Sequence, residues 1–383
     1  MRCLTLSTIA AVLLTLCDAA QSSDIETFRN GFPADPNFFP VGVWLQEPRN
    51  AAEFKSIGVN TFVGLWQGPT EAQLSELAAR GMFAVADQNE TALRSQNARV
   101  IRGWMQPDEP DNAQTSALGG FGPCVPAATV RERTREMKRR DATRPVMINF
   151  GQGLANPYWK GRGSCTGDTE YYDIAMQGAD IVSSDIYPVT STIDPVRGKL
   201  EYVARATDEL IRRARSGQTV WAVMETTFIQ SQQRVTPEQL RAEIWMALIH
   251  GAKGIIYFVH EWTGGFREDG IFRHPEIVEE AKRNNQLIQT LAPVLNSGNV
   301  RNLVKVSSPS ISIMVKKYED ALYIFAVAMD QNAVTARLQL PVQDGTAEVL
   351  GEARSIPFHG GILQDRFAGY GVRLYRVALP ANR

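Results

Sequence analysis

The feature that most constrains the fold is an eightfold alternation of short apolar runs with longer segments of helical periodicity, which begins near residue 41. Short runs rich in β-branched residues predict strands, and the longer segments predict crossover helices between parallel strands. The predicted strands cover residues 41–45, 60–66, 83–87, 100–105, 145–150, 181–187, 220–225 and 255–262. Eight strands in this order predict a (β/α)8 TIM barrel.

The segments between these runs have the spacing of amphipathic helices. The clearest of them cover residues 70–80, 130–141, 197–216, 237–250 and 275–291. Thr70 and Thr236 stand where side-chain N-caps are expected, and Pro237 occupies a first helical position, which its fixed φ suits. Glycines precede several strands, as residues that end helices often do.

Past residue 296 the periodicity changes to alternation, as in residues 312–315 and 321–326, with glycine-rich turns up to Arg383. This pattern predicts antiparallel strands with one buried face. We therefore divide the chain into a barrel at residues 21–296 and a small C-terminal β-sandwich at residues 297–383.

Residues 1–20 have the order of a secretory signal peptide, with Arg2, an apolar run over residues 4–16, and small residues at the end. We expect export, so that the protein is secreted or periplasmic. Cys17 leaves lipid anchoring as an alternative, although Leu16 is larger than a lipoprotein signal prefers. The apolar run is too short for a permanent membrane span, and no later stretch approaches about 20 apolar residues.

Export also bears on Cys124 and Cys165, the two cysteines outside this segment. An oxidising compartment favours a disulfide between them over two unrelated buried thiols. Neither CxxC nor HExxH occurs and the histidines lack ligand spacing, so no metal site is expected. The formal net charge of −1 gives no electrostatic footprint for nucleic acid.

Polar and aromatic side chains gather at the ends of the predicted strands, where the active sites of TIM barrels lie. They are Trp44, Glu47, Trp66, Asp87, Asp108, Glu109, Asn149, Asp185, Tyr187, Glu225, His260, Glu261 and Trp262. Carboxylates and amides hydrogen-bond sugar hydroxyls, and flat aromatic rings pack against the C–H faces of pyranoses. The set therefore predicts an oligo- or polysaccharide substrate.

Two of these carboxylates, Glu109 and Glu225, end the fourth and seventh predicted strands. Cleavage of a glycosidic bond needs one carboxyl group to protonate the leaving oxygen and a second to act as nucleophile or base. The segments VIRGWMQPDEPDN at residues 100–112, VWAVMETT at 220–227 and IIYFVHEW at 255–262 resemble the clan A glycoside hydrolases. The resemblance implies that Glu109 is the acid/base, Glu225 the nucleophile with Tyr187 beside it, and Trp262 the ring beneath the sugar.

Asp108 departs from the clan A pattern, which usually has Asn before the acid/base Glu. An ionised Asp only accepts hydrogen bonds, so either sugar recognition differs at this position or Asp108 raises the pKa of Glu109 by like-charge repulsion. If the register of the seventh strand is shifted, Glu261 replaces Glu225. The predicted substrate-binding residues are Trp44, Trp66 and Trp262 for stacking and Asp87, Asp108, Asn149, Asp185 and Tyr187 for polar contacts, although Asn149 and Asp185 could equally satisfy loop backbone.

The predicted function is a retaining glycoside hydrolase that acts by double displacement and needs no cofactor. The alternative is a non-catalytic carbohydrate-binding barrel, because a fold does not dictate a function. The presence of both Glu109 and Glu225 favours the enzyme. A metal-dependent hydrolase or a phosphate-binding isomerase has only His260-Glu261 and Gly264-Gly265 in its favour.

Overall fold

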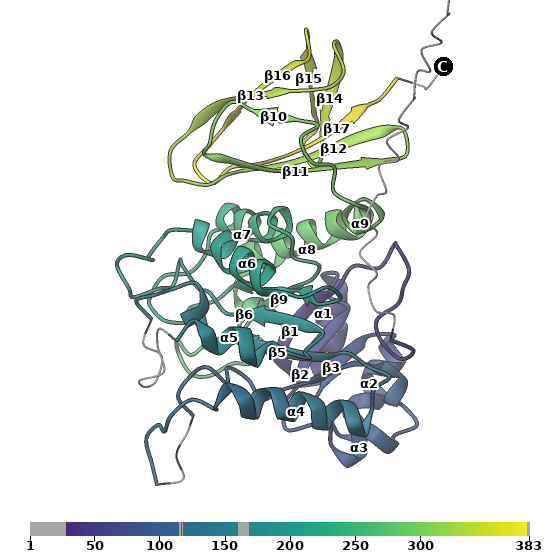
Figure 1. The fold of residues 1–383 in the computed structure, drawn as a ribbon, viewed down its shortest axis with the longest axis vertical. Coiled ribbons are helices and arrows are strands. Elements are labelled where there is room, and N and C mark those ends of the chain that lie inside the picture. The colour runs from purple at the N-terminus through teal and green to yellow at the C-terminus, as the bar shows by residue number, and fades with distance from the viewer. Residues whose placement is uncertain (1–27, 115, 117, 160–167, 381–383) are drawn as a thin grey trace, which may run out of the picture.

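The computed structural model describes residues 28–114, 116, 118–159 and 168–380. A parallel sheet surrounded by helices forms the larger part, and two antiparallel sheets form the smaller part above it (Figure 1). The predicted signal peptide, Cys17 and Cys165 lie outside the described residues. No helix of the described residues is long and apolar enough to cross a membrane.

All eight predicted barrel strands are present. Their bounds are Val41–Gln46 (β1), Thr61–Leu65 (β2), Phe83–Ala86 (β3), Ile101–Met105 (β4), Val146–Phe150 (β5), Ile181–Ser184 (β6), Thr219–Val220 (β7), Ala222–Glu225 (β8) and Ile255–Phe258 (β9). The sheet has the order β7-β6-β5-β4-β3-β2-β1-β9-β8. Because β7 and β8 are two parts of one predicted strand, interrupted at Trp221, this order closes the sheet on itself. The predicted TIM barrel is therefore confirmed.

Side chains alternate across the barrel wall, as the period of a strand requires. Val223 of β8 and Ile256 of β9 belong to the core inside the barrel, whereas Met224 and Tyr257 belong to the core between the strands and the helices. Met105 and Met147 fill the same interior. The interior is thus packed with side chains, and polar groups appear where the strands end.

The five predicted helices form with slightly different ends, as α2, α4, α6, α7 and α8, and shorter helices accompany them. Their bounds are Ala51–Ser56 (α1), Glu71–Arg80 (α2), Glu90–Arg94 (α3), Ala127–Arg140 (α4), Glu170–Ala175 (α5), Glu201–Arg213 (α6), Pro237–Ile249 (α7), Pro275–Thr290 (α8) and Ala292–Asn296 (α9). Thr70 and Thr236 each accept a hydrogen bond from the third helical residue in a capping box, which confirms both predicted N-caps. Short 3-10 turns lie at Pro48–Asn50, Ala98–Val100, Gln152–Leu154 and Gly270–Arg273.

The C-terminal part is a sandwich of two antiparallel sheets, as predicted. Its strands are Lys305–Val306 (β10), Ile311–Tyr318 (β11), Ala321–Ala328 (β12), Val334–Gln339 (β13), Gly345–Val349 (β14), Arg354–Phe358 (β15), Ile362–Phe367 (β16) and Val372–Ala378 (β17). They make one sheet of order β10-β13-β16 and another of order β11-β12-β17-β14-β15. Both sheets contribute to one core, for example Leu338 from β13 and Ile324 from β12.

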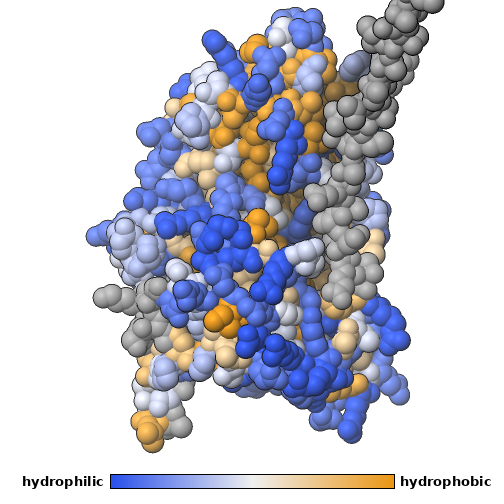
Figure 2. Space-filling view, viewed as in Figure 1, coloured by the Kyte–Doolittle hydropathy of each residue, from blue (hydrophilic) through white to orange (hydrophobic). Residues whose placement is uncertain are grey.

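The sandwich rests on the helices at one side of the barrel, above α7 and α9 (Figure 1). Trp245 of α7 stacks on Phe325 of β12, with ring centroids 5.6 Å apart and an interplanar angle of 9°. In the same view the surface over the barrel is mainly hydrophilic, and apolar residues gather toward the sandwich (Figure 2). The Trp245–Phe325 contact buries large apolar surface, so it stabilises the packing of the two parts.

Candidate active site

The predicted site residues lie at the carboxyl ends of the barrel strands. Asp87 and Asp108 are exposed to solvent, and Glu109 is half-buried. Asn149, Asp185 and Tyr187, by contrast, are buried. The exposed and the buried groups therefore form two layers at this end of the barrel.

Asn149 links two of these carboxyl groups. Its amide donates hydrogen bonds to Asp108 Oδ1 at 3.0 Å and to Asp185 Oδ1 at 3.1 Å. Its own oxygen accepts a hydrogen bond from the Ser183 hydroxyl at 2.7 Å. Asn149 is thus engaged with protein groups, and it positions the carboxyl groups of β6 and of the loop after β4.

Four acidic residues, Asp108, Glu109, Asp111 and Asp185, influence one another electrostatically, and we call them the carboxylate cluster. Burial among protein atoms and the charge of Glu109 raise the pKa of Asp108 to about 7. Asp108 nevertheless has exposed surface, which means that protein surrounds it on most sides while water still reaches it. Burial also raises the pKa of Asp185 well above its ordinary value.

Asp111 is the buried support of the cluster. Burial and the charge of Glu109 raise its pKa to about 7, although the Gly151 amide donates to it at 2.8 Å and the Tyr172 hydroxyl at 3.0 Å. Asp111 could not be identified from the sequence, because it lies beyond the strand end and its partners come from two later segments.

Glu109 has an unusual backbone conformation, with φ at +39°. Its amide donates to the Asn149 carbonyl at 3.1 Å, and its carboxylate accepts from the Asn112 amide at 2.7 Å. A positive φ costs energy for a residue with a side chain, and such residues persist where the surrounding structure holds them in place, often at functional sites. The loop after β4 therefore holds Glu109 in a defined orientation.

Glu225 is placed differently, since its side chain has 0% exposure. Its carboxylate accepts hydrogen bonds from the backbone amides of Val189 at 2.7 Å and Thr190 at 2.9 Å, and it contacts Glu243 of α7. Burial raises the pKa of Glu225, and its main hydrogen-bonding partners are Thr190, Val189 and Glu243 rather than the carboxylate cluster. Tyr187, expected beside Glu225, interacts instead with Asp185.

Glu261, the alternative to Glu225, is an ion-paired residue. Its carboxylate contacts Arg273 at 3.0 Å and His274 at 2.5 Å. Although burial opposes them, these two partners lower the pKa of Glu261. The side chain is buried, and both of its oxygens are engaged, so it is a structural anchor of the loop after β9.

Aromatic side chains form an exposed group at the same end of the barrel. Trp66, Trp262 and Phe266 are 39%, 50% and 51% exposed, and we call them the aromatic rim. The ring of Phe266 lies 6.4 Å from that of Trp66 and 5.8 Å from that of Trp262. Trp44, the third predicted stacking residue, is instead buried in the barrel interior. Phe266 was not predicted because it lies in a loop, after the strand end.

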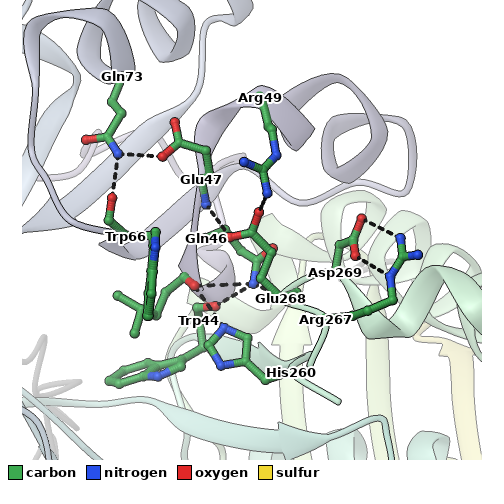
Figure 3. Close-up of polar contacts among 11 residues, drawn as sticks. Trp44, Gln46, Glu47, Arg49, Trp66, Gln73, His260, Arg267, Glu268 and Asp269 are labelled. Atoms are coloured by element: carbon green, nitrogen blue, oxygen red, sulfur yellow. Dashed lines mark hydrogen bonds and ion pairs between the residues drawn. The ribbon is translucent and has the colours of Figure 1, made fainter. Parts of the chain in front are cut away.

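Glu268 ties the loop that carries Phe266 to the loop after β1 (Figure 3). Its carbonyl accepts from the Gln46 amide at 2.6 Å, and its carboxylate accepts from the Glu47 backbone amide at 3.2 Å and pairs with Arg49.

Gln73 continues this network by donating to the Glu47 carboxylate at 2.9 Å and to the Trp66 carbonyl at 2.7 Å. The network thus fixes both loops that carry the aromatic rim.

A TIM barrel, an acidic group at the carboxyl ends of its strands and an aromatic rim are together typical of carbohydrate-active barrel enzymes. The Glyco_hydro_42 family, described as beta-galactosidase, matches residues 126–297. This range contains Glu225 and begins after Glu109. A search of curated proteins finds no match.

Among solved structures, the α-amylase of Geobacillus thermoleovorans has a TM-score of 0.55 at 10% identity, covering 89% of this chain and 98% of that one. The α-galactosidase I of Mortierella vinacea has a TM-score of 0.54 at 10% identity, covering 91% and 99%. A putative α-galactosidase of Bacteroides fragilis has a TM-score of 0.54 at 12% identity, covering 89% and 79%. These structures show that the chain shares the fold of TIM-barrel glycosidases, and the family match covers less than half of the chain.

Proposed function

We propose that the chain hydrolyses O-glycosidic bonds of an oligo- or polysaccharide with retention of configuration, with Glu109 as acid/base and Glu225 as nucleophile. Glu225 attacks the anomeric carbon while Glu109 protonates the leaving oxygen. Glu109 then deprotonates a water molecule that releases the sugar from Glu225. The single observation that carries the proposal is the position of Glu109, which is partly exposed near the buried Asp111 and Asp185 at the end of the barrel that also carries the aromatic rim.

Burial raises the pKa of Glu225, but its hydrogen bonds oppose this rise. Two backbone amides donate to its carboxylate, and hydrogen bonds of this kind favour the ionised form that a nucleophile needs. Because Glu225 has no exposed surface, the proposal requires that the connection carrying Val189 and Thr190 moves when a sugar binds. Loops after barrel strands commonly make such movements.

The aromatic rim and the carboxylate cluster supply the two kinds of contact that a sugar needs. Trp66, Trp262 and Phe266 offer flat faces, and Asp87 and Asp108 offer exposed acceptors for hydroxyl groups. Since the matched family is described as beta-galactosidase, aryl β-galactosides are the first substrates to test, followed by other aryl glycosides and by oligosaccharides.

The test combines product stereochemistry with chemical rescue. We expect NMR to show that the first product formed has the same anomeric configuration as the substrate. We expect Glu109→Ala to be slow on substrates with poor leaving groups and to form a glycosyl azide when azide is added. If the wild type hydrolyses none of these substrates yet binds a sugar as tightly as Glu109→Ala does, the chain is a non-catalytic binding protein.

We also propose export through the signal peptide and a disulfide between Cys124 and Cys165. Cys124 lies in the loop after β4, where its sulfur lies 2.7 Å from the Asp111 carbonyl oxygen. A disulfide would tie this loop to the segment that follows β5 and wall one side of the site. Peptide mapping of exported protein without reduction should find the Cys124–Cys165 cross-link and a chain that begins after residue 20.

A further inference from the structure

Glu225 lies beside a second buried carboxyl group, that of Glu243, with which it interacts. Glu243, on α7, is 0% exposed, as is Glu225. The two carboxyl groups interact with each other. Neither side-chain oxygen of Glu243 has a partner in hydrogen-bond geometry in the described part of the chain. No ion pair within the described residues involves either carboxylate.

Both carboxyl groups are fully buried, and many of the residues near them in the chain are apolar. Leu240, Ile244 and Ala247 of α7 belong to the core between the barrel and its helices, and so do Val189 and Met224. Two like charges in contact in such a medium repel strongly, and each loses the stabilisation that water would give it. The pair therefore holds one proton between its two carboxyl groups.

The hydrogen bonds show which group keeps the proton. Glu225 accepts hydrogen bonds from the backbone amides of Val189 and Thr190, which stabilise its anion, whereas only the backbone of Glu225 acts in this way on Glu243. Burial and the charge of Glu225 raise the pKa of Glu243 well above its ordinary value. Burial raises the pKa of Glu225 too, but the contacts with Thr190 and Val189 oppose this rise.

Other charged groups on the elements that pack against α7 are engaged elsewhere. Glu280 of α8 pairs with Arg283 at 2.8 Å, and Lys316 of β11 donates to the carbonyls of Leu295 and Ser297. On α6, Asp208 pairs with His250 at 2.8 Å. Glu225 is the charged group that acts on Glu243.

We propose that Glu243 is a positioning residue, which stays protonated and donates a hydrogen bond to Glu225 so that Glu225 is the sole anion of the pair. Its catalytic consequence rests on the proposed function. When Glu225 forms the glycosyl ester, Glu243 keeps its proton and donates to the ester oxygen that does not carry the sugar. When water cleaves the ester, the carboxylate returns with its donor in place, so the proton on Glu243 is neither consumed nor released.

Two substitutions of Glu243 distinguish a hydrogen-bond donor from a side chain that only fills space. Glu243→Gln retains a donor, so we expect kcat within about threefold of wild type and a similar pH profile. Glu243→Leu removes the donor, and we expect kcat to fall on the order of tenfold with KM little changed, since the lost hydrogen bond is made to a charged group. Glu238→Gln, at an exposed position of the same helix, is the control and should match wild type.

Infrared spectroscopy tests the proton without any substrate. At pH 7, the absorption of protonated carboxyl groups should be smaller in Glu243→Gln than in wild type or Glu238→Gln, by the amount that one group contributes. Other protonated acids, in the carboxylate cluster, absorb equally in all three proteins. Equal absorption in the three proteins would overturn the proposal, and so would an unchanged kcat in Glu243→Leu. If the absorption is lost but wild type cleaves no glycoside, the protonated pair is supported and the proposed function fails.

Discussion

The two carboxylates proposed to act together lie in opposite surroundings. Glu109 is partly open to solvent, has a strained backbone and is surrounded by Asp108, Asp111 and Asp185. Glu225 is sealed from solvent and held by two backbone amides. An acid/base exchanges protons with water and the leaving group, so it must stay accessible, whereas a nucleophile must stay ionised and oriented. The contrast matches this division of labour.

The largest effect should come from removing the sealed carboxylate. We expect Glu225→Ala to lower kcat by about 10⁴-fold or more, because no other group supplies the nucleophile. Glu261→Ala is the matched control, a buried Glu at the next strand end, and should reduce stability with far less effect on kcat. If the two variants lose equal activity, the assignment of the nucleophile is wrong. The measurement is kcat with an aryl glycoside, with circular dichroism to verify folding.

The next largest effect is expected on the pH dependence of the free energy of unfolding, through Asp111 of the carboxylate cluster. The pKa of Asp111 rises from 3.8 to about 7 on folding. A raised carboxyl pKa gives stability that is fully present below the unfolded-state pKa and is lost as pH rises through about 7. Asp111→Asn cannot ionise, so it should gain stability over wild type between pH 4 and 7, by about 4 kcal/mol at most. Urea unfolding from pH 4 to 7 measures the free energy of unfolding of both proteins. A difference between them that does not change with pH would contradict the prediction.

A smaller effect is expected from changes in the aromatic rim, which should affect substrate binding and not the chemical step. Phe266→Ala should raise KM on the order of tenfold for an oligosaccharide, with little change in kcat, because a stacked ring is lost. Ile211→Ala, which truncates an exposed apolar residue of α6, serves as the control. If Phe266→Ala leaves KM unchanged for every substrate that the enzyme cleaves, the rim does not bind the sugar.

The smallest effect is expected for the ion pair of Glu268 with Arg49, which joins the loop after β9 to the loop after β1. Glu268→Gln keeps the size of the side chain and its backbone carbonyl but removes the charge that pairs with Arg49. Because Arg49 is mostly exposed, solvent screens this ion pair. We therefore expect KM to rise only about twofold to threefold, and Arg49→Gln to do the same. A larger loss in either variant would show that the loop after β9 depends on this pair.

The barrel could be predicted from sequence because each strand and helix carries its own local signal. Periodicity located all eight strands, and Thr70 and Thr236 marked two helix starts. The break at Trp221 could not be predicted, since the run from 220 to 225 is uniformly apolar up to Glu225. Its interruption depends on how the strand packs.

The site was predicted less completely, because its contacts join segments far apart in the chain. The rule that strand ends meet located the polar residues, including Glu109 and Asp185. It did not give the direction of Glu225, which depends on amides of the connection after β6 and on Glu243 of α7. It also missed Phe266 and Glu268, since the tie from Gln46 to Glu268 spans 222 residues and leaves no local pattern.

The most direct test of the paired roles is to trap the glycosyl-enzyme with a 2-deoxy-2-fluoro glycoside and locate the label by peptide mass mapping. We expect one labelled residue, Glu225, with the wild type and with Glu243→Gln. A label on Asp185 or Asp108 would contradict it, because the nucleophile would then belong to the carboxylate cluster and the sealed carboxylate would be structural.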